Sequence, residues 1–173
     1  MVTKPVPFLV ANLPEHLQLK QMILNGLQGA AHEAVSLTNW HLPGNHCLDM
    51  LLTPLQNVAD KMFAASGHGV TIANTWFQQY NTGSHHGWHT HRNAHFSCIY
   101  YLELPADAPV TEFKDWQGNI FTVPVTEGQV LAAPAFFIHQ SPPNASDARK
   151  TIVAFNVNLH EKTTFTQLLQ HKA

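Results

Sequence analysis

Apolar residues in the first third of the chain recur every three or four positions, which is the period of an amphipathic helix. One such stripe follows Pro14 and stops at Gly29, a residue that commonly ends helices. The pattern therefore predicts a first helix between these two residues. Its apolar positions are Leu17, Met22, Ile23, Leu24 and Leu27.

A second stripe follows Thr53 and Pro54 and ends at Gly67. Threonine suits the N-cap, proline suits the first helical position, and Gln56 completes a capping-box pattern. These features predict a second helix that begins at this Thr-Pro pair. Its apolar face consists of Leu55, Val58, Ala59 and Met62.

From residue 70 onward the pattern changes to short runs rich in Val, Ile, Phe and Tyr, separated by Gly, Pro, Asn and Asp. Because no helical stripes alternate with these runs, they predict an antiparallel sandwich or barrel, and we expect a jelly roll. The two helices would cover one outer face of it. The predicted strands span residues 70–80, 96–104, 111–115, 119–123, 129–133, 136–140 and 149–159.

The composition favours one globular domain over residues 1–173, in which 45% of residues are hydrophobic and 12% are charged. We expect a helical cover at 1–67, a jelly-roll core at 68–160 and a tail at 161–173 with a short helix over 163–170. A formal net charge of -2 excludes a strongly basic nucleic-acid binder. The sequence contains no long apolar run and no basic-then-apolar leader, so neither a membrane partner nor secretion is expected. Two cysteines, Cys47 and Cys98, are too few for a disulfide framework and favour the cytoplasm.

Histidine is the unusual residue in this chain, with 13 copies against 9 lysines and arginines. Several gather between His85 and His95, and His89 and His91 are separated by one residue. On an extended strand, side chains two residues apart project from the same face, so these two imidazoles could bind one transition metal. A pair of histidines on a solvated loop is the alternative.

A third histidine, His139, lies inside an apolar run, and Arg149 opens the next apolar run ten residues later. Because the intervening loop is short, we expect the two runs to pair as a hairpin, which would bring Arg149 near the strand of His139. A guanidinium buried in a barrel needs an anion. The alternatives are a core histidine at 139 and an arginine that pairs with Asp147 or stays at the surface.

These residues together resemble the iron(II)- and 2-oxoglutarate-dependent oxygenases, in particular a small bacterial and phage group of that family. The resemblance rests on the order His89-x-His91, then His139, then Arg149 ten positions later. Residues 76–83, 89–102 and 149–156 resemble the strand before the first ligand, the ligand segment and the closing strand of that group. The resemblance covers about half of the chain, residues 70 to 159.

The resemblance implies a double-stranded β-helix that uses Fe(II), O₂ and 2-oxoglutarate to oxidise, by hydroxylation above all, a substrate. Its metal ligands would be His89, His91 and His139. Arg149 would bind the distal carboxylate of 2-oxoglutarate, with Tyr80 and Thr151 as further contacts. One departure is clear: the family's usual Asp or Glu ligand is replaced by His91.

The same residues also resemble the cupins, which share this fold. Gly83 with His89-x-His91 is similar to the first cupin motif, and Gly128 with Pro134 and His139 is similar to the second. That resemblance implies a three-histidine enzyme, either a dioxygenase independent of 2-oxoglutarate or a zinc or nickel isomerase or hydrolase. A metal-free binding module is the third alternative. The low charge argues against a polyanionic partner, and we expect a small-molecule substrate more than a macromolecule. Exposed sheet edges would allow a homodimer.

Overall fold

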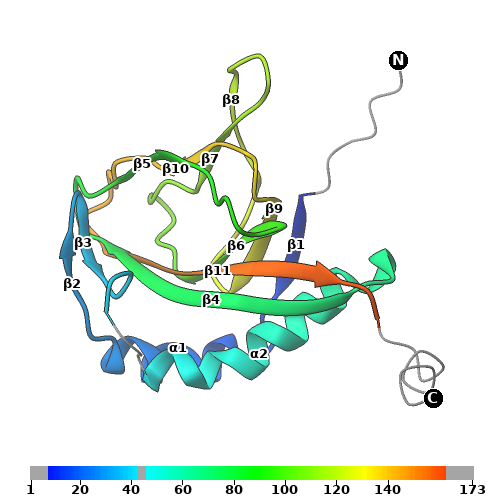
Figure 1. Ribbon diagram of the computed structural model, residues 1–173. Coiled ribbons are helices and arrows are strands. Elements are labelled where there is room, and N and C mark those ends of the chain that lie inside the picture. Colours follow the sequence, from blue (N-terminus) through cyan, green and yellow to red (C-terminus); the bar gives the residue numbers. More distant parts are fainter. Residues whose placement is uncertain (1–7, 43–45, 163–173) are drawn as a thin grey trace, which may run out of the picture.

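The computed structural model describes residues 8–42 and 46–162 of the chain. Two antiparallel β-sheets face each other, and two helices lie on the outer side of the larger sheet (Figure 1). The larger sheet has seven strands in the order β1-β9-β6-β11-β4-β3-β2, and the smaller has four in the order β5-β10-β7-β8. This is the sandwich that the sequence predicts.

The strands of the large sheet are β1 (Leu9–Asn12), β2 (Ala30–His32), β3 (Val35–Thr38), β4 (Gly69–Tyr80), β6 (Phe96–Glu103), β9 (Gln129–Pro134) and β11 (Lys150–His160). Those of the small sheet are β5 (His86–His89), β7 (Glu112–Lys114), β8 (Ile120–Thr122) and β10 (His139–Ser141). β4 and β11 pair along their whole lengths at the centre of the large sheet.

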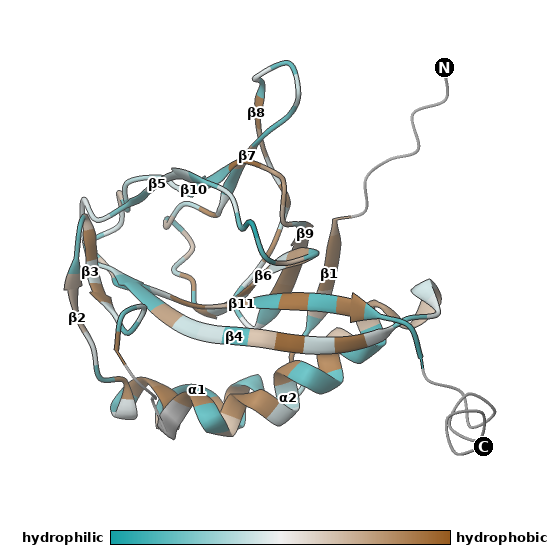
Figure 2. Cartoon of the chain, viewed as in Figure 1, coloured by the Kyte–Doolittle hydropathy of each residue, from teal (hydrophilic) through white to brown (hydrophobic). Residues whose placement is uncertain are grey.

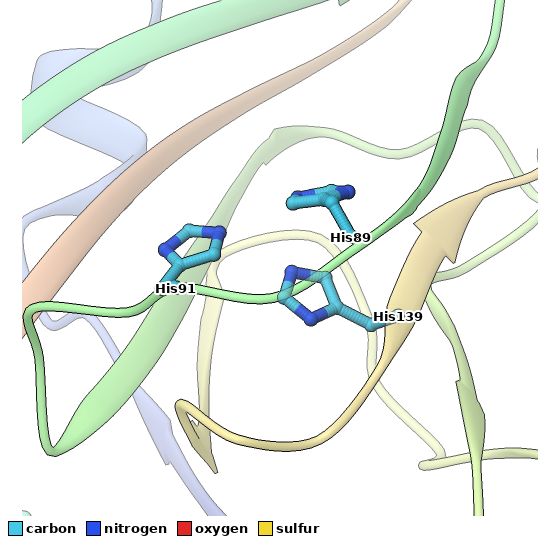
Figure 3. Close-up of side chains that lie close together, drawn as sticks. All are labelled: His89, His91 and His139. Atoms are coloured by element: carbon cyan, nitrogen blue, oxygen red, sulfur yellow. The ribbon is translucent and has the colours of Figure 1, made fainter.

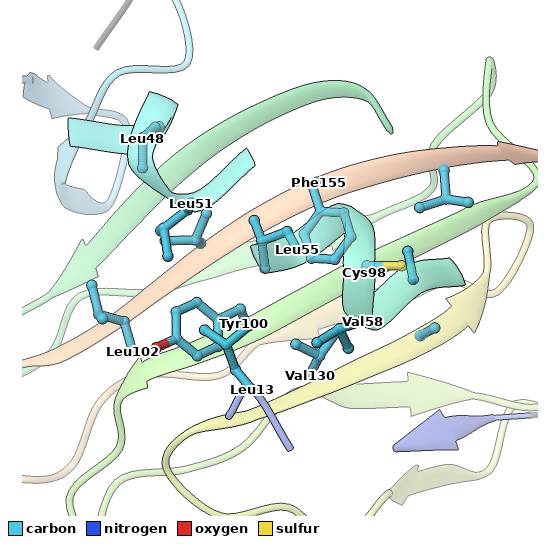
Figure 4. Close-up of a cluster of buried hydrophobic side chains, with 14 of the residues drawn as sticks. Leu13, Leu48, Leu51, Leu55, Val58, Cys98, Tyr100, Leu102, Val130 and Phe155 are labelled. Atoms are coloured by element: carbon cyan, nitrogen blue, oxygen red, sulfur yellow. The ribbon is translucent and has the colours of Figure 1, made fainter. Parts of the chain in front are cut away.

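The helices are α1 (His16–Gly26) and α2 (His46–Met62), followed by a short 3₁₀ turn at Ala64–Ser66. The turns of α1 and α2 alternate between hydrophobic and hydrophilic residues (Figure 2). The apolar face of α2 packs on side chains of the large sheet to form the main core (Figure 4). This core includes Leu48, Leu51, Leu55, Val58, Cys98, Tyr100, Val130 and Phe155. In the described part of the chain, no helix has the length and apolarity that a membrane span needs.

Alternation along β11 separates this core from the interior of the sandwich. Val153 and Phe155 point to the helices, whereas Ile152 and Ala154 line a cavity between the two sheets. Successive residues of a strand project to opposite faces, so Lys150 and Asn156 share the cavity side with Ile152. This parity decides which polar residues can reach the site.

Four details of the sequence prediction are wrong. α2 begins at His46, so Pro54 lies inside the helix instead of at its start, and no capping box forms at Thr53. The first third also contains strands β1, β2 and β3, and residues 136–138 form a turn that precedes β10. The expected hairpin is absent, because β10 pairs with β5 and β7 in one sheet while β11 pairs with β4 and β6 in the other. The helix expected over residues 163–170 lies outside the described residues.

Candidate metal centre

Three histidines converge in the cavity between the sheets (Figure 3). His89 ends β5, His91 follows two residues later, and His139 begins β10 directly opposite His89 in the strand register. One ring nitrogen from each lies within 4.8 Å of the others, and within the described residues this is the one such group. The structure thus brings together all three ligands that the sequence predicts.

Hydrogen bonds at the far side of each ring fix which nitrogen faces the centre. Nδ1 of His89 donates to the carbonyl of Gly87 at 2.7 Å, and Nδ1 of His139 donates to the carbonyl of Phe137 at 3.0 Å. Nδ1 of His91 is 2.5 Å from Oδ1 of Asn156 on β11. Because Nδ1 carries the proton in each ring, Nε2 retains its lone pair, which is the form that binds a metal ion.

The three imidazoles are also held in the neutral state. Burial above all, together with the neighbouring His89, lowers the pKa of His139 to about 3. Burial likewise lowers the pKa of His89 and of His91. A metal ion competes with protons for these nitrogens, so depressed pKa values keep the site available well below neutral pH.

A buried lysine lies beside the same cavity. Lys150, at the start of β11, is 1% exposed, and its Nζ donates to Oγ of Ser141 at 2.7 Å and to the carbonyl of Pro109 at 2.9 Å. It also lies 4.7 Å from the ring centroid of Tyr80. Burial lowers the pKa of Lys150 to about 8, so the amine is still largely protonated at neutral pH. No carboxylate of the described residues pairs with it, and a buried ammonium without one attracts an anionic ligand.

Arg149, the expected anion ligand, points the other way. Its side chain is 43% exposed and forms a bidentate pair with Glu103 at 2.9 and 3.0 Å. The buried hydroxyl of Thr151 lies on the same side of β11 and donates to the same carboxylate at 2.5 Å. The expectation that Arg149 and Thr151 face the cavity is therefore wrong, because strand parity turns both residues away from it. Tyr80 does line the cavity, as expected.

No protein-family model and no curated protein sequence matches the chain. Solved structures do resemble it. A viral collagen prolyl hydroxylase from Paramecium Bursaria Chlorella virus-1, solved with 2-oxoglutarate, is 12% identical with a TM-score of 0.63, and the match covers 94% of this chain and 100% of that one. A prolyl-4-hydroxylase from Pseudomonas putida is 14% identical with a TM-score of 0.63, covering 91% and 94%. A 2OG-Fe(II) oxygenase family oxidoreductase from Burkholderia pseudomallei is 13% identical with a TM-score of 0.57, covering 70% and 60%. The chain has the fold of the 2OG-Fe(II) oxygenases.

This fold confirms the predicted jelly roll. Two spaces that share lining residues adjoin the three histidines. The inner one, toward Ser141 and Tyr80, has a free volume of about 20 Å³. The outer one has about 510 Å³ and opens toward the β2–β3 hairpin. Both spaces are lined by Trp76, His86, His89 and His91, so the three-histidine cluster lies between them.

Sequence reasoning missed two residues of this site, Lys150 and Asn156. Asn156 had a usable signal, because it is the first polar residue after the apolar run of residues 152–155. The signal for Lys150 was its parity with Asn156, since residues an even number of positions apart share a face of a strand.

Proposed function

We propose that the chain is an Fe(II)- and 2-oxoglutarate-dependent dioxygenase that oxidises, by hydroxylation, an unidentified substrate. The observation that carries this proposal is the presence of three converging imidazoles in one cavity and of a buried ammonium, without a carboxylate partner, that donates to Ser141 in the wall of that cavity. A metal ion and an anionic chelator that reaches from it to Lys150 would satisfy both. The oxygenase fold supports the same combination, since a structural neighbour was solved with 2-oxoglutarate.

The donor set fits iron. Imidazole nitrogen is a good ligand for Fe(II), and three on one side would leave coordination positions for other ligands. His89, His91 and His139 would hold the ion, and Asn156 would orient His91. When bound, iron and 2-oxoglutarate supply the oxidation of a substrate C–H bond by O₂, with decarboxylation of 2-oxoglutarate to succinate.

The chain's own contribution is binding, orientation and exclusion of water. Lys150 would receive the distal carboxylate of 2-oxoglutarate, and the hydroxyls of Tyr80 and Ser141 lie beside it. A cavity of about 20 Å³ holds one or two water molecules, so a five-carbon dicarboxylate requires lining side chains to move outward. Gln140 can do so, because it is only half-buried and already reaches Glu112.

The substrate would occupy the outer space, whose volume of about 510 Å³ is typical of small-molecule sites. The structural neighbours include enzymes described as prolyl hydroxylases, so a residue of a peptide is also a candidate. A cytoplasmic location, a single domain and a homodimer remain our predictions from the sequence.

An anaerobic titration tests the proposal. Metal-free protein receives Fe(II) and then 2-oxoglutarate, and the visible iron-to-ketoacid charge-transfer band is recorded. We expect the band in the wild type and in Arg149→Ala, a control that removes the neighbouring cation. His139→Ala should give no band, and Lys150→Met should require at least about tenfold more 2-oxoglutarate, because a charge-assisted hydrogen bond is worth about 1.5–3 kcal/mol.

One observation favours a second function. The triad contains no carboxylate, and three neutral imidazoles also suit a catalytic zinc site or a dioxygenase that binds its substrate directly at iron. If Fe(II) binds without a charge-transfer band, 2-oxoglutarate is not the cosubstrate and this second function, including its nickel and zinc variants, replaces the first.

A further inference from the structure

A fourth imidazole, His86 on β5, lies against the triad without belonging to it. Its ring stacks on that of His89 with a centroid separation of 4.1 Å and an interplanar angle of 27°. It borders both the inner and the outer space. Its Nδ1 is 3.1 Å from Nε2 of Gln78, and an amide nitrogen can only donate. His86 therefore accepts at Nδ1, whereas the three triad histidines donate there.

A chain of two hydrogen bonds explains this difference. It begins at Tyr80, whose hydroxyl donates to Oε1 of Gln78 at 2.7 Å. The amide of Gln78 is thereby oriented with its nitrogen toward His86. The hydroxyl of Tyr80 thus fixes the orientation of the Gln78 amide, and that amide sets the proton position of His86.

The consequence is a neutral His86 with its proton on Nε2, because a ring that accepts at Nδ1 carries its proton on the other nitrogen. Among the described residues, no hydrogen-bond partner is found for Nε2. The donor is therefore free for a ligand.

The outer space that His86 borders has an aromatic wall. Trp40 and Trp76 pack edge to face with centroids 4.4 Å apart, and Trp40 remains 46% exposed. The charged residues that line the outer space are Arg92 and Glu33, so the formal charges of its wall cancel. Such a wall suits a flat or ring-bearing group without net charge.

We propose that His86 is a substrate-binding residue whose Nε2–H donates to an oxygen acceptor of an uncharged, ring-bearing substrate packed on Trp40 and Trp76. The acceptor would be a carbonyl, hydroxyl or ether oxygen next to the position that is oxidised. This assignment rests on the proposed function only in naming the ligand a substrate. The position of the His86 proton can be tested without iron, 2-oxoglutarate or turnover.

The test is nitrogen NMR of the histidine side chains in the zinc-loaded protein, because zinc is diamagnetic. We expect His86 to be protonated at Nε2 and not at Nδ1, and the triad histidines to be protonated at Nδ1 and metal-bound at Nε2. In Gln78→Glu, a carboxylate accepts from both Tyr80 and His86, so the His86 proton should move to Nδ1. The signals of His85, which is outside the chain of hydrogen bonds, serve as the internal control.

Zinc affinity gives the second readout. His86→Phe should bind zinc as the wild type does, whereas His139→Ala should lose more than the roughly 10–100-fold typical of an outer-shell change. Zinc bound at Nε2 of His86, or a loss of affinity in His86→Phe equal to that in His139→Ala, would make His86 a ligand and overturn the proposal. So would a wild-type His86 protonated at Nδ1.

The substrate role is tested once turnover is found. His86→Phe should raise KM more than it lowers kcat, and His86→Gln, whose amide is also a donor, should restore KM in part. If the charge-transfer band is missing but His86 is protonated at Nε2, only the proposed function is refuted. If the band appears but His86 is protonated at Nδ1, only the role of His86 is refuted.

Discussion

Replacing Lys150 by methionine should change how stability depends on pH. Methionine has a similar length and no charge, so it removes the buried ammonium with little change in volume. Burial lowers the pKa of Lys150 to about 8, whereas a lysine in the unfolded chain titrates near 10.4. Between these values the unfolded state binds a proton that the folded state does not, so the wild-type free energy of unfolding should rise with pH.

The size of this effect follows from the two pKa values. Each pH unit inside the window contributes about 1.4 kcal/mol, and allowance for partial titration at both ends gives about 2 kcal/mol between pH 7 and 9.5. Lys150→Met should lack this rise. At pH 7 two opposite effects act on the free energy of unfolding of the variant. It rises because no ammonium has to be buried, and it falls because two hydrogen bonds, to Ser141 and Pro109, are lost at about 1 kcal/mol each. Its net stability at pH 7 should therefore lie within about 2 kcal/mol of the wild type.

Urea unfolding at several pH values measures both quantities. Lys61→Met is the control, because Lys61 is an exposed lysine in the last turn of α2 and its loss should leave the wild-type rise intact. If the wild type and Lys150→Met keep a constant difference from pH 7 to 9.5, the ammonium is already compensated in the free protein. The inference of an anion site at Lys150 would then fail.

Three further predictions concern the triad and the outer face. Asn156→Ala should weaken zinc binding by about 10–100-fold in calorimetry, because Asn156 alone among the described residues fixes the proton of His91. An unchanged affinity would contradict that role. Arg149→Ala should lower the free energy of unfolding by at most about 1 kcal/mol, since its pair with Glu103 is partly exposed, and a larger loss would place the guanidinium in the core. Burial lowers the pKa of His139 to about 3 from about 6.5, so the metal-free protein should lose about 2 kcal/mol of stability between pH 7 and 5, a loss that His139→Gln should not show.

The three-histidine cluster could be predicted from the sequence because its geometry is largely local. His89 and His91 are two residues apart, and a short extended segment places both on one side whatever surrounds it. His139 was identified by its isolation in an apolar run. The strands β4, β6 and β9 were also predicted from local sequence, because their length and composition suffice to define them.

The candidate anion-binding residue, Lys150, was not predicted in this way. β11 is buried on both faces, between the helices on one side and the cavity on the other, and its residues 152–155 are all apolar. Only Asn156, further along the strand, indicates by its parity that Lys150 and not Arg149 points inward. Strands β1 and β3 were missed because each pairs with a strand far away in the chain, β9 and β4 respectively. Strand β2 was missed because it has only three residues and pairs with β3 at the edge of the sheet. Pro54 was misread because packing on the sheet tolerates a proline inside α2.

The absence of acidic residues from the described lining of the inner cavity has a consequence for competing solutes. A divalent ion held by the three histidines would bring two positive charges to the cavity, and Lys150, in contact with Ser141 and Tyr80 of its wall, would add a third beside it. Dianions should therefore bind more tightly than monoanions of the same size, and sulfate or phosphate in the buffer should compete with 2-oxoglutarate. Because the cavity is shielded from solvent, raising the chloride concentration should weaken this competition much less than it would at an exposed site.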